Sequence, residues 1–351
     1  MLSVAPVLYL MVVGYYRGME RALYQKHRPQ TFQDIIEQPQ VVSVLEKAVA
    51  GDAVAHAYLF TGPRGIGKTS VARIFAQGLG CQGIDVFEID AASHTSVEHI
   101  RALTESVYTQ PVESERKVYI LDEVHMLSKA AFNAFLKTLE EPPAYAIFML
   151  VTTEADKVPD TIVSRCVSLQ FQQPSLTALQ GVVASVAQKE GYTLDEQSVA
   201  LIALMAEGSF RDALTLTQKV LFVADQGVVP HETVEQVLGA PRHQVVNDYL
   251  AALVAQDVAQ GVAALEKVAS AGGNVSLFAK LCIRKLRAAL LLRGNVPGVA
   301  DAYSEEDATF ITTLSEKEGV TLALLKTLID ASYDIQRSYI KTLPLEYPLL
   351  G

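Results

Sequence analysis

Hydrophobic and polar residues alternate between two kinds of stretch from about residue 35 to residue 170. Short, nearly continuous apolar runs end at polar or glycine residues and are separated by segments with helical periodicity. β-rich runs of this kind between amphipathic helices are typical of a buried parallel sheet. The runs that predict strands are 56–62 (HAYLFTG), 86–90 (VFEID), 117–125 (KVYILDEVH), 146–153 (AIFMLVTT) and 166–174 (CVSLQFQQP). We therefore expect an α/β domain.

After Pro174 the strand signal fades and the pattern becomes helical. Glycine and aspartate breaks divide the first helices, and the helical pattern resumes beyond Pro241. The predicted helices are 177–189, 198–207, 210–224, 231–238, 247–256, 258–271, 275–293 and 320–343. This organisation predicts an N-terminal segment (1–18), an α/β nucleotide domain (19–172), a small helical domain (173–240) and a terminal helical domain (241–351).

The N-terminal stretch of residues 2–16 (LSVAPVLYLMVVGYY) is apolar and uncharged. It is shorter than the roughly 20 residues that a membrane-spanning helix needs, and it lacks the positive region of a secretory signal. We favour an upstream start codon chosen in error, with Met19 as the true start. A packed strand or partner-binding patch and a membrane anchor are the alternatives.

Composition changes this picture in two ways. The chain has 351 residues and a net charge of −10, so contact with nucleic acid would have to come from local basic groups or backbone amides. The three cysteines, Cys81, Cys166 and Cys282, lie far apart and form no CxxC pair. Neither a disulfide framework nor a zinc site is indicated, and we expect a reducing, cytoplasmic setting.

The motif GPRGIGKT, residues 62–69, lies between the apolar run AYLF and the helical stretch SVARIFAQ. Glycines let backbone amides turn toward phosphate oxygens, and the N-terminus of the following helix favours negative charge. Lys68 is expected to reach the β- and γ-phosphates, and the Thr69 hydroxyl to bind Mg²⁺. The predicted cradle comprises Gly62, Pro63, Arg64, Gly65, Ile66, Gly67, Lys68, Thr69 and Ser70.

Two adjacent carboxylates, Asp122 and Glu123, end the apolar run VYIL. Side-by-side carboxylates after a buried strand cost stability unless a cation or water lies there. We expect Asp122 to hold Mg²⁺ and Glu123 to polarise an attacking water. A water-activating glutamate favours hydrolysis of the nucleotide over transfer to a substrate hydroxyl. An ordinary acidic strand end is the alternative.

Longer stretches extend the pattern beyond a general P-loop. They are 22–38 (ALYQKHRPQTFQDIIEQ), 122–143 (DEVHMLSKAAFNAFLKTLEEPP) and 152–166 (TTEADKVPDTIVSRC). These motifs resemble the bacterial clamp-loader ATPase, the γ/τ subunit of DNA polymerase III. The similarity runs from about residue 22 to the C-terminus. It implies an α/β P-loop (AAA+) domain with a parallel sheet, a small helical lid and an all-α collar domain for oligomerisation.

The resemblance also assigns roles to single residues. Tyr24, Arg28 and Pro29 would lie against the adenine, with Val41 nearby. Thr153 matches the first sensor, on the γ-phosphate side of the nucleotide. Arg165, in SRC, matches the arginine finger that reaches the γ-phosphate of a neighbouring subunit. Arg211 matches the second sensor on the lid.

Simpler interpretations stay open for several of these residues. Arg165 could be a surface salt-bridge residue, and Arg211 could pair with Asp212 within a helix. Thr153 could merely be a residue that favours a strand, and Pro29 could end an extended segment.

The chain departs from the family pattern after the cradle helix. A zinc-binding insertion with four cysteines is usual there, but this chain runs almost directly from helix to strand with only Cys81. His94 and His99 lie too far along to rebuild such a site, so we expect no zinc. Ser93 would cap a helix that tracks one DNA strand. His125 is interpreted as packed or polar rather than catalytic.

The favoured function is an ATP- and Mg²⁺-dependent motor subunit in a heteropentameric clamp loader. Its implied partners are the other clamp-loader subunits, the sliding clamp and primer–template DNA, with no membrane. Family assignment also groups it with the DNA-directed DNA polymerase holoenzyme, a nucleotidyltransferase. The alternatives are an ATP-binding scaffold subunit with little hydrolysis and another AAA+ DNA remodeller. The final residues, 339–350, resemble the close of the collar domain, so we expect the short form of the subunit.

Overall fold

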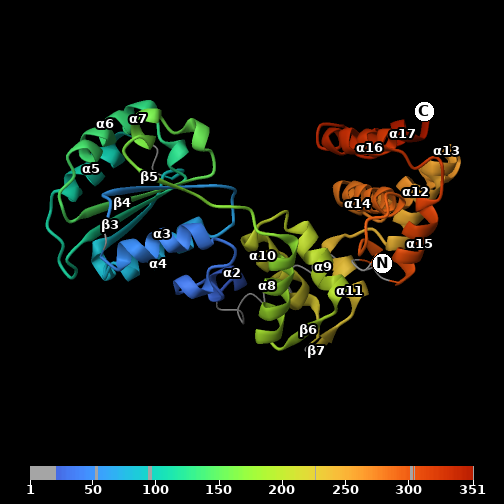
Figure 1. Ribbon diagram of the computed structural model, residues 1–351, viewed down its shortest axis with the longest axis horizontal. Coiled ribbons are helices and arrows are strands. Elements are labelled where there is room, and N and C mark those ends of the chain that lie inside the picture. Colours follow the sequence, from blue (N-terminus) through green and yellow to red (C-terminus); the bar gives the residue numbers. More distant parts are fainter. Residues whose placement is uncertain are drawn as a thin grey trace, which may run out of the picture. The chain divides into compact units, whose positions relative to one another are not determined.

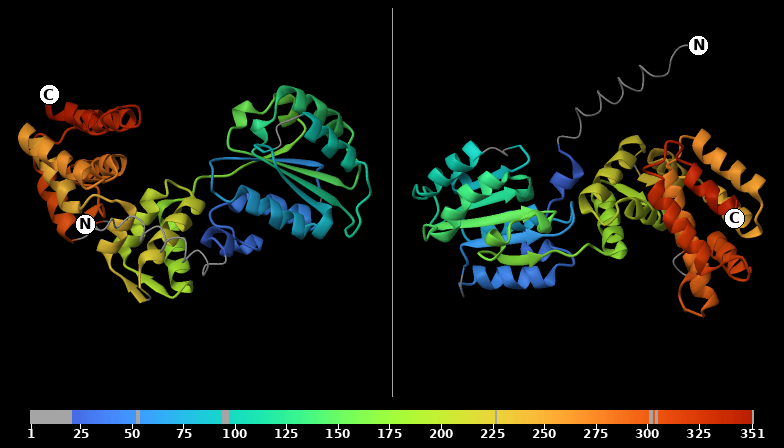
Figure 2. Two further views of the ribbon diagram at one scale, coloured as in Figure 1. Left: turned by 180° about the vertical axis from the view of Figure 1, so that it is seen from behind. Right: turned by 90° about the horizontal axis from the view of Figure 1, so that it is seen from above.

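The computed structural model describes residues 21–51, 54–93, 97–225, 227–300, 303 and 305–350 (Figures 1 and 2). The apolar stretch 2–16 and His94 lie outside these residues. The chain divides into two compact units. The first comprises the described residues up to Glu190 together with Ile202–Gln218, and the second comprises Gly191–Leu201 and the residues from Lys219 on. Each unit is described by itself.

The first unit is built on a sheet of five parallel strands in the order β2-β3-β4-β1-β5. All five predicted runs form strands, so the predicted parallel sheet is confirmed. The strands are β1 (Ala57–Thr61), β2 (Val86–Asp90), β3 (Lys117–Asp122), β4 (Ala146–Thr152) and β5 (Val167–Gln170). In this order β1, which leads into the GPRGIGKT motif, lies between β4 and β5, and the carboxylates that end β3 are one strand beyond β4.

Helices cover both faces of the sheet (Figure 1). Helices α3 (Pro39–Val49) and α4 (Lys68–Gly78) pack on one face, against Tyr58 and Phe60 of β1 among others. Helices α5 (Val97–Val107) and α6 (Lys129–Glu140) pack on the other, where Leu59 of the same strand points. Strands β1, β3 and β4 are buried on both faces, which explains why they read as unbroken apolar runs.

Short elements complete the loops around the sheet. They are α2 (Leu23–Lys26), η1 (Phe32–Asp34), η2 (Gly83–Asp85), η3 (Val124–Met126), η4 (Ala155–Lys157) and α7 (Asp160–Val163).

The segment after the sheet is mainly helical. It contains α8 (Leu176–Lys189), α9 (Glu196–Met205), α10 (Phe210–Val223) and α11 (His231–Leu238). The hydroxyl of Ser175 caps α8 by accepting a hydrogen bond from the amide of Ala178 at 3.1 Å. The purely helical prediction was incomplete, because β6 (Tyr192–Leu194) and β7 (Gly227–Val229) form a parallel pair in the second unit. Strands of three residues are too short to give a periodic signal.

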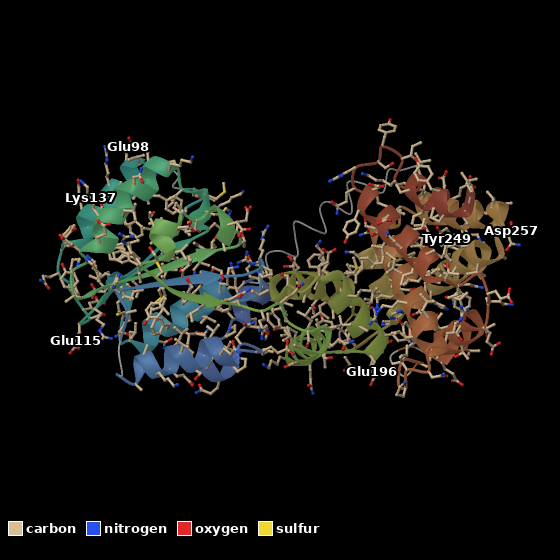
Figure 3. All side chains as sticks on the ribbon, turned by 45° about the horizontal axis from the view of Figure 1, so that its top comes forward. Glu98, Glu115, Lys137, Glu196, Tyr249 and Asp257 are labelled. Carbon is tan, nitrogen blue, oxygen red and sulfur yellow. The ribbon has the colours of Figure 1, made fainter. Side chains whose placement is uncertain are left out.

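The remaining helices of the second unit are α12 (His243–Ala255), α13 (Val258–Ser270), α14 (Val275–Arg293), α15 (Glu305–Ser315), α16 (Leu322–Asp334) and α17 (Leu343–Leu350). They share one apolar core. Within it Tyr249 is fully buried, and its hydroxyl donates to the carbonyl of Leu345 at 2.8 Å (Figure 3).

In the second unit one helix was omitted from the prediction and the extent of another was misjudged. Helix α15 was missed, because its sequence is rich in acidic residues and threonine. The single helix predicted for 320–343 is interrupted between α16 and α17. Lys341 Nζ donates to the carbonyls of Ile335 and Gln336, so these carbonyls after α16 are paired with a side chain instead of with the amides of a continuing helix. The predicted architecture of an α/β domain followed by helical regions is otherwise confirmed, and the domain boundaries at 172 and 240 stay predictions.

A polar link crosses this helical core. The ammonium of Lys285 on α14 lies 2.5 Å from Oδ1 of Asp307 on α15 and 2.8 Å from Oδ1 of Asn247 on α12. Burial lowers the pKa of Lys285, while the hydrogen bond and charge of Asp307 oppose this. The link is therefore a buried ion pair that joins three helices.

None of the helices in the described part of the chain is both long and apolar enough to cross a bilayer.

Candidate functional site: a nucleotide-binding cradle

Two glycines in the loop between β1 and α4 combine a positive φ with close contact to a neighbouring segment. Gly62 and Gly65 have φ values of 140° and 76°, which side-chain-bearing residues rarely adopt. A Cβ at Gly62 would lie 2.6 Å from the carbonyl oxygen of Phe171, and one at Gly65 would lie 2.0 Å from the Ser209 hydroxyl. The loop is thus held closely between the end of β5 and the start of α10, with its backbone turned as a phosphate cradle requires.

Lys68 begins α4 and is 6% exposed. Its ammonium donates to the carbonyls of Gly62 and Pro63, both at 2.6 Å. Burial lowers the pKa of Lys68 to about 8, although the charges of Glu123 and Asp122 oppose this. A desolvated ammonium held against the loop is ready to exchange carbonyl partners for phosphate oxygens, which bind it more strongly.

Thr69 and Asp122 come together from α4 and the end of β3. The Thr69 hydroxyl donates to Oδ2 of Asp122 at 2.7 Å. Hydroxyl and carboxylate oxygens are hard donors, and Mg²⁺ is usually held by one or two such protein groups together with substrate phosphates. The donor set therefore fits the predicted Mg²⁺, which would neutralise charge on the phosphates.

Glu123 has a left-handed backbone, with φ 49° and ψ 44°. This conformation costs a residue other than glycine roughly 1–2 kcal/mol and persists where the surrounding structure enforces it. The Glu123 amide donates to Oδ1 of Asp122 at 2.9 Å, and its carboxylate accepts from the Thr153 hydroxyl at 3.0 Å. Because of this turn, the two neighbouring carboxylates accept hydrogen bonds from different residues: Asp122 from Thr69 and Glu123 from Thr153.

His125 lies beside Glu123 with its side chain 7% exposed. Its Nδ1 is 3.1 Å from the Thr152 hydroxyl and 3.5 Å from Oε2 of Glu123, and its Nε2 is 3.2 Å from Oε1 of Glu154. The imidazole is therefore a polar neighbour of the glutamate that is expected to polarise water.

These groups line a phosphate-side pocket of about 500 Å³. It is lined by Arg28, Arg64, Gly65, Gly67, Lys68, Thr69, Ser70, Asp90, Ala92, Asp122, Glu123, His125, Met126, Thr153 and Arg211. Asp90, Ala92 and Met126 were not predicted. Asp90 had a usable signal, because it ends the apolar run of β2, and parallel strands bring their carboxyl ends to one edge of a sheet.

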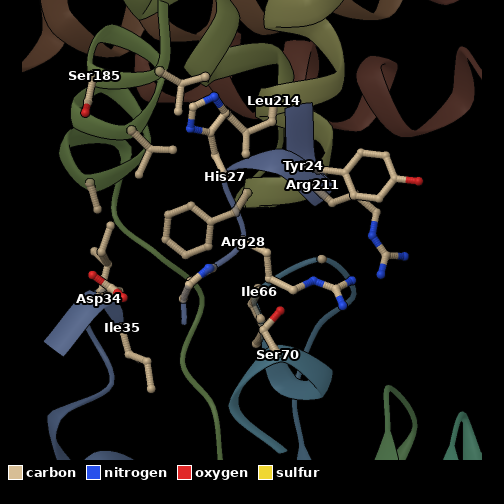
Figure 4. Close-up of a pocket in the computed structure, with 18 of the residues that line it drawn as sticks. Tyr24, His27, Arg28, Asp34, Ile35, Ile66, Ser70, Ser185, Arg211 and Leu214 are labelled. Carbon is tan, nitrogen blue, oxygen red and sulfur yellow. The ribbon is translucent and has the colours of Figure 1, made fainter. Parts of the chain in front are cut away.

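A second, base-side pocket of about 670 Å³ shares Arg28, Gly65, Gly67, Ser70 and Arg211 with the first. Tyr24 and Pro29, which the resemblance places against the adenine, line it together with Ile66 of the predicted cradle. In Figure 4 the Tyr24 ring lies beside Arg211, whose guanidinium carbon is 5.8 Å from the ring centroid. The volume of each pocket falls within the range of about 300–1,000 Å³ that is typical of small-molecule sites.

Helix α8 forms a wall of the base-side pocket that the sequence did not predict. Ala178, Gly181, Val182, Ser185, Val186 and Lys189 line the pocket. Gly181 lies within the helix, and a Cβ there would meet no heavy atom within 4 Å. A glycine inside a helix costs about 1 kcal/mol relative to alanine, so a glycine within the predicted helix 177–189 was the signal that the sequence offered.

Four predicted site residues are not among those that line the two pockets, and they are Gly62, Pro63, Val41 and Arg165. The carbonyls of Gly62 and Pro63 accept hydrogen bonds from Lys68. Val41 on α3 is 3% exposed and packs in the core between the sheet and helices α3 and α4, and its predicted place near the base stays a prediction. Arg165 donates to Oε1 of Glu140 at 2.7 Å and to the carbonyl of Thr161 at 2.6 Å. Within this chain Arg165 therefore forms the surface ion pair that the sequence left open.

The segment after the cradle helix is described only in part. The Ser93 hydroxyl donates to Oδ2 of Asp90 at 2.9 Å, and residues 94–96 lie outside the described residues, so the capping role of Ser93 stays a prediction. Cys81 is buried, and burial raises the pKa of its thiol. Over the residues that the structure describes, no group of three or more His, Cys, Asp or Glu side chains is arranged to hold a metal ion.

The strand–cradle–helix unit, the acidic pair after β3 and the five-stranded parallel sheet define an AAA+ ATPase fold. The RuvB Holliday junction branch migration motor of Thermotoga maritima superposes with a TM-score of 0.52 over 65% of this chain and 79% of that one. At 22% sequence identity, this likeness shows the fold alone.

Sequence comparison is more specific. The chain belongs to the gamma/tau subunit family of the DNA polymerase III clamp loader. It is 38% identical to the DNA polymerase III subunit gamma of Buchnera aphidicola subsp. Acyrthosiphon pisum over 271 residues, 71% of this chain and 75% of that protein. It is 37% identical to the subunit tau/gamma of Haemophilus influenzae over 294 residues, 78% of this chain but only 43% of that protein.

Two family models match successive parts of the chain. The model "DNA polymerase III, delta subunit" matches residues 37–88 and 82–175. The model "DNA polymerase III clamp loader subunit, ATPase lid domain" matches residues 178–226. The family predicted from the sequence motifs is therefore confirmed.

Proposed function

We propose that this chain is an ATP-hydrolysing motor subunit of a clamp loader, which opens a sliding clamp and loads it onto primer–template DNA. The single observation that carries the proposal is the arrangement around β3. One phosphate-side pocket contains the Thr69–Asp122 pair at 2.7 Å, the Glu123–Thr153 pair at 3.0 Å and Lys68. A nucleotide-binding scaffold needs the cradle, but it does not need a glutamate held at the γ-phosphate side.

The proposed chemistry is in-line hydrolysis of the terminal phosphate of ATP. Lys68 and the cradle amides hold the β- and γ-phosphates, and Thr69 with Asp122 holds Mg²⁺, which supplies charge neutralisation there. Glu123 accepts a proton as the water oxygen attacks the γ-phosphorus and the bond to the leaving ADP oxygen breaks. Nucleotidyl transfer is the work of the polymerase with which such a loader is associated, not of this site.

Arg165 is proposed to complete the site of a neighbouring subunit. Its position outside both pockets of its own chain supports a role in trans. A guanidinium is permanently charged and forked, which suits the charge that spreads over a transferring phosphoryl group. Hydrolysis would then depend on assembly into a ring, proposed to be a heteropentamer with other clamp-loader subunits.

The test measures ATP turnover by the full chain assembled with partner subunits, with and without a sliding clamp and primed DNA. We expect clamp and primed DNA to stimulate turnover. Glu123→Gln should retain ATP binding and lower turnover by about 100-fold or more, the usual scale for losing a positioned general base. No stimulation over the isolated chain, together with an inert Glu123→Gln, would favour the scaffold. Movement of branched DNA without any clamp would favour another AAA+ remodeller.

A further inference from the structure

The base-side residues lie on a segment that is fastened at both ends. At its start, the amide of Leu23 donates to Oε1 of Gln218 on α10 at 3.0 Å, and the Leu23 side chain is buried. At its end, Lys26 and His27 reach Glu190 at the C-terminal end of α8, with contacts of 2.8 Å and 2.5 Å. The helix α2 is therefore attached to two helices that follow the sheet.

Glu190 is the meeting point of these contacts. Its side chain is 12% exposed, and that of His27 is 13% exposed, whereas Lys26 is 54% exposed. Burial alone would raise the pKa of Glu190, but hydrogen bonds from Lys26 and His27 hold the pKa below its usual value. The carboxylate is thus stabilised in its charged form by two partners from one short segment.

The fastened segment and α8 form facing walls of the base-side pocket. Tyr24, Arg28 and Pro29 line it from the segment, and Ser185 and Lys189 line it from α8. In Figure 4 His27 lies between the helix that carries Ser185 and Leu214, while the Arg28 guanidinium points toward Ser70. Glu190 itself is not among the lining residues, so any effect on a ligand must pass through the residues it holds.

Loss of this carboxylate would leave two neighbouring groups unmatched. Lys26 and His27 would lose their shared acceptor, and the positive charge of Lys26 at the pocket would no longer be balanced by this carboxylate. Removing one partner of a partly buried ionic contact releases the segment that the contact ordered.

We propose that Glu190 is a positioning residue for the base of the bound nucleotide. By holding Lys26 and His27 at the end of α8, it fixes the segment that carries Tyr24 and Arg28, so that this wall of the base-side pocket is formed before the nucleotide binds. The inference rests on the proposed function and extends it. It assigns base recognition to a contact between α2 and α8, while the phosphates are held separately by the cradle.

The test compares two ligands on the full chain by isothermal titration calorimetry. One ligand is Mg-ATP, and the other is Mg-tripolyphosphate, which has the phosphates but no base. We expect Glu190→Gln to raise the Kd for Mg-ATP about tenfold and to leave the Kd for Mg-tripolyphosphate within about twofold. A general loss of stability would weaken both ligands, so the ratio of the two Kd values reports positioning.

Two further variants make the test decisive. Glu46→Gln removes an exposed carboxylate on α3 and should leave both Kd values unchanged. Lys26→Met removes an exposed partner, so the fold should tolerate it, and it should weaken Mg-ATP selectively even if Glu190→Gln does not fold. Unchanged Mg-ATP binding in both variants, or equal weakening of both ligands, would overturn the inference. A wild-type chain that binds neither ligand would contradict the proposed function itself.

Discussion

At the scale of single residues, the site depends on the hydrogen-bond partner of each charged side chain. Asp122 and Glu123 are adjacent carboxylates, and the left-handed backbone at Glu123 directs them to Thr69 and Thr153 respectively. Lys68 lies behind the loop on carbonyl oxygens, with a pKa of about 8 because it is buried. The charges are therefore arranged before nucleotide binds, which reduces the reorganisation that binding requires.

Replacing Lys68 tests the assignment of the cradle. We expect Lys68→Ala to abolish measurable ATP binding, a loss of about 100-fold or more, because charged hydrogen bonds to phosphate contribute roughly 1.5–3 kcal/mol each. Calorimetry with Mg-ATP measures this, with Lys47→Ala on the exposed side of α3 as the control. Tight binding by Lys68→Ala would show that the nucleotide lies elsewhere.

At the scale of elements, contacts between helices decide what the helices can do. The base-side wall depends on α2, α8 and α10, which are far apart in the sequence. In the second unit Lys285 joins α14 to α15 and α12 through Asp307 and Asn247. Such a buried ionic link specifies one packing of its helices but does not by itself add much stability.

Removing Asp307 from this link should lower the free energy of unfolding far more than removing its exposed neighbour Glu306. Asp307→Ala leaves the Lys285 ammonium, 5% exposed, without its carboxylate, and should lower the free energy of unfolding by about 3 kcal/mol. The neighbouring Glu306→Ala should change it by less than about 0.5 kcal/mol, because Glu306 is exposed and pairs with His243 at the surface. Denaturant unfolding of the full chain measures both. Equal effects would mean that the link is no more important than a surface pair.

At the scale of the whole molecule, the proposed activity requires more than one chain. Arg165 lies outside both pockets and is paired with Glu140 in its own chain. A trans role therefore requires this guanidinium to leave Glu140, an exchange that an exposed pair worth less than about 1 kcal/mol allows.

Two variants separate the trans role from a structural one. Arg165→Ala should leave ATP binding unchanged and lower turnover of the assembled ring by about 1,000-fold, the lower range for an arginine finger. Glu140→Ala breaks the same ion pair but leaves the guanidinium available, so the ring should keep its turnover. Steady-state hydrolysis by the ring and by the isolated chain gives the comparison. Equal loss in both variants would assign Arg165 to the ion pair alone.

Much of the fold was predictable from local pattern. All five strands and the helix boundaries of α11 and α14 followed from periodicity and breaks. In such segments the spacing of apolar residues along the chain already shows which face is buried. The small pair β6–β7 and the missed helix α15 did not, because their stability comes from pairing and packing with distant segments.

The sequence alone determined the family, the cradle and the residue types that hydrolysis needs, since their chemistry depends on spacing along β1, α4 and β3. Only the tertiary structure decided which groups meet. It paired Thr69 with Asp122, turned Glu123 toward Thr153, placed α8 on the base-side wall and joined Lys26 and His27 to Glu190. Residues separated by up to 164 positions make these contacts, and no local pattern encodes a distance between segments that only folding brings together.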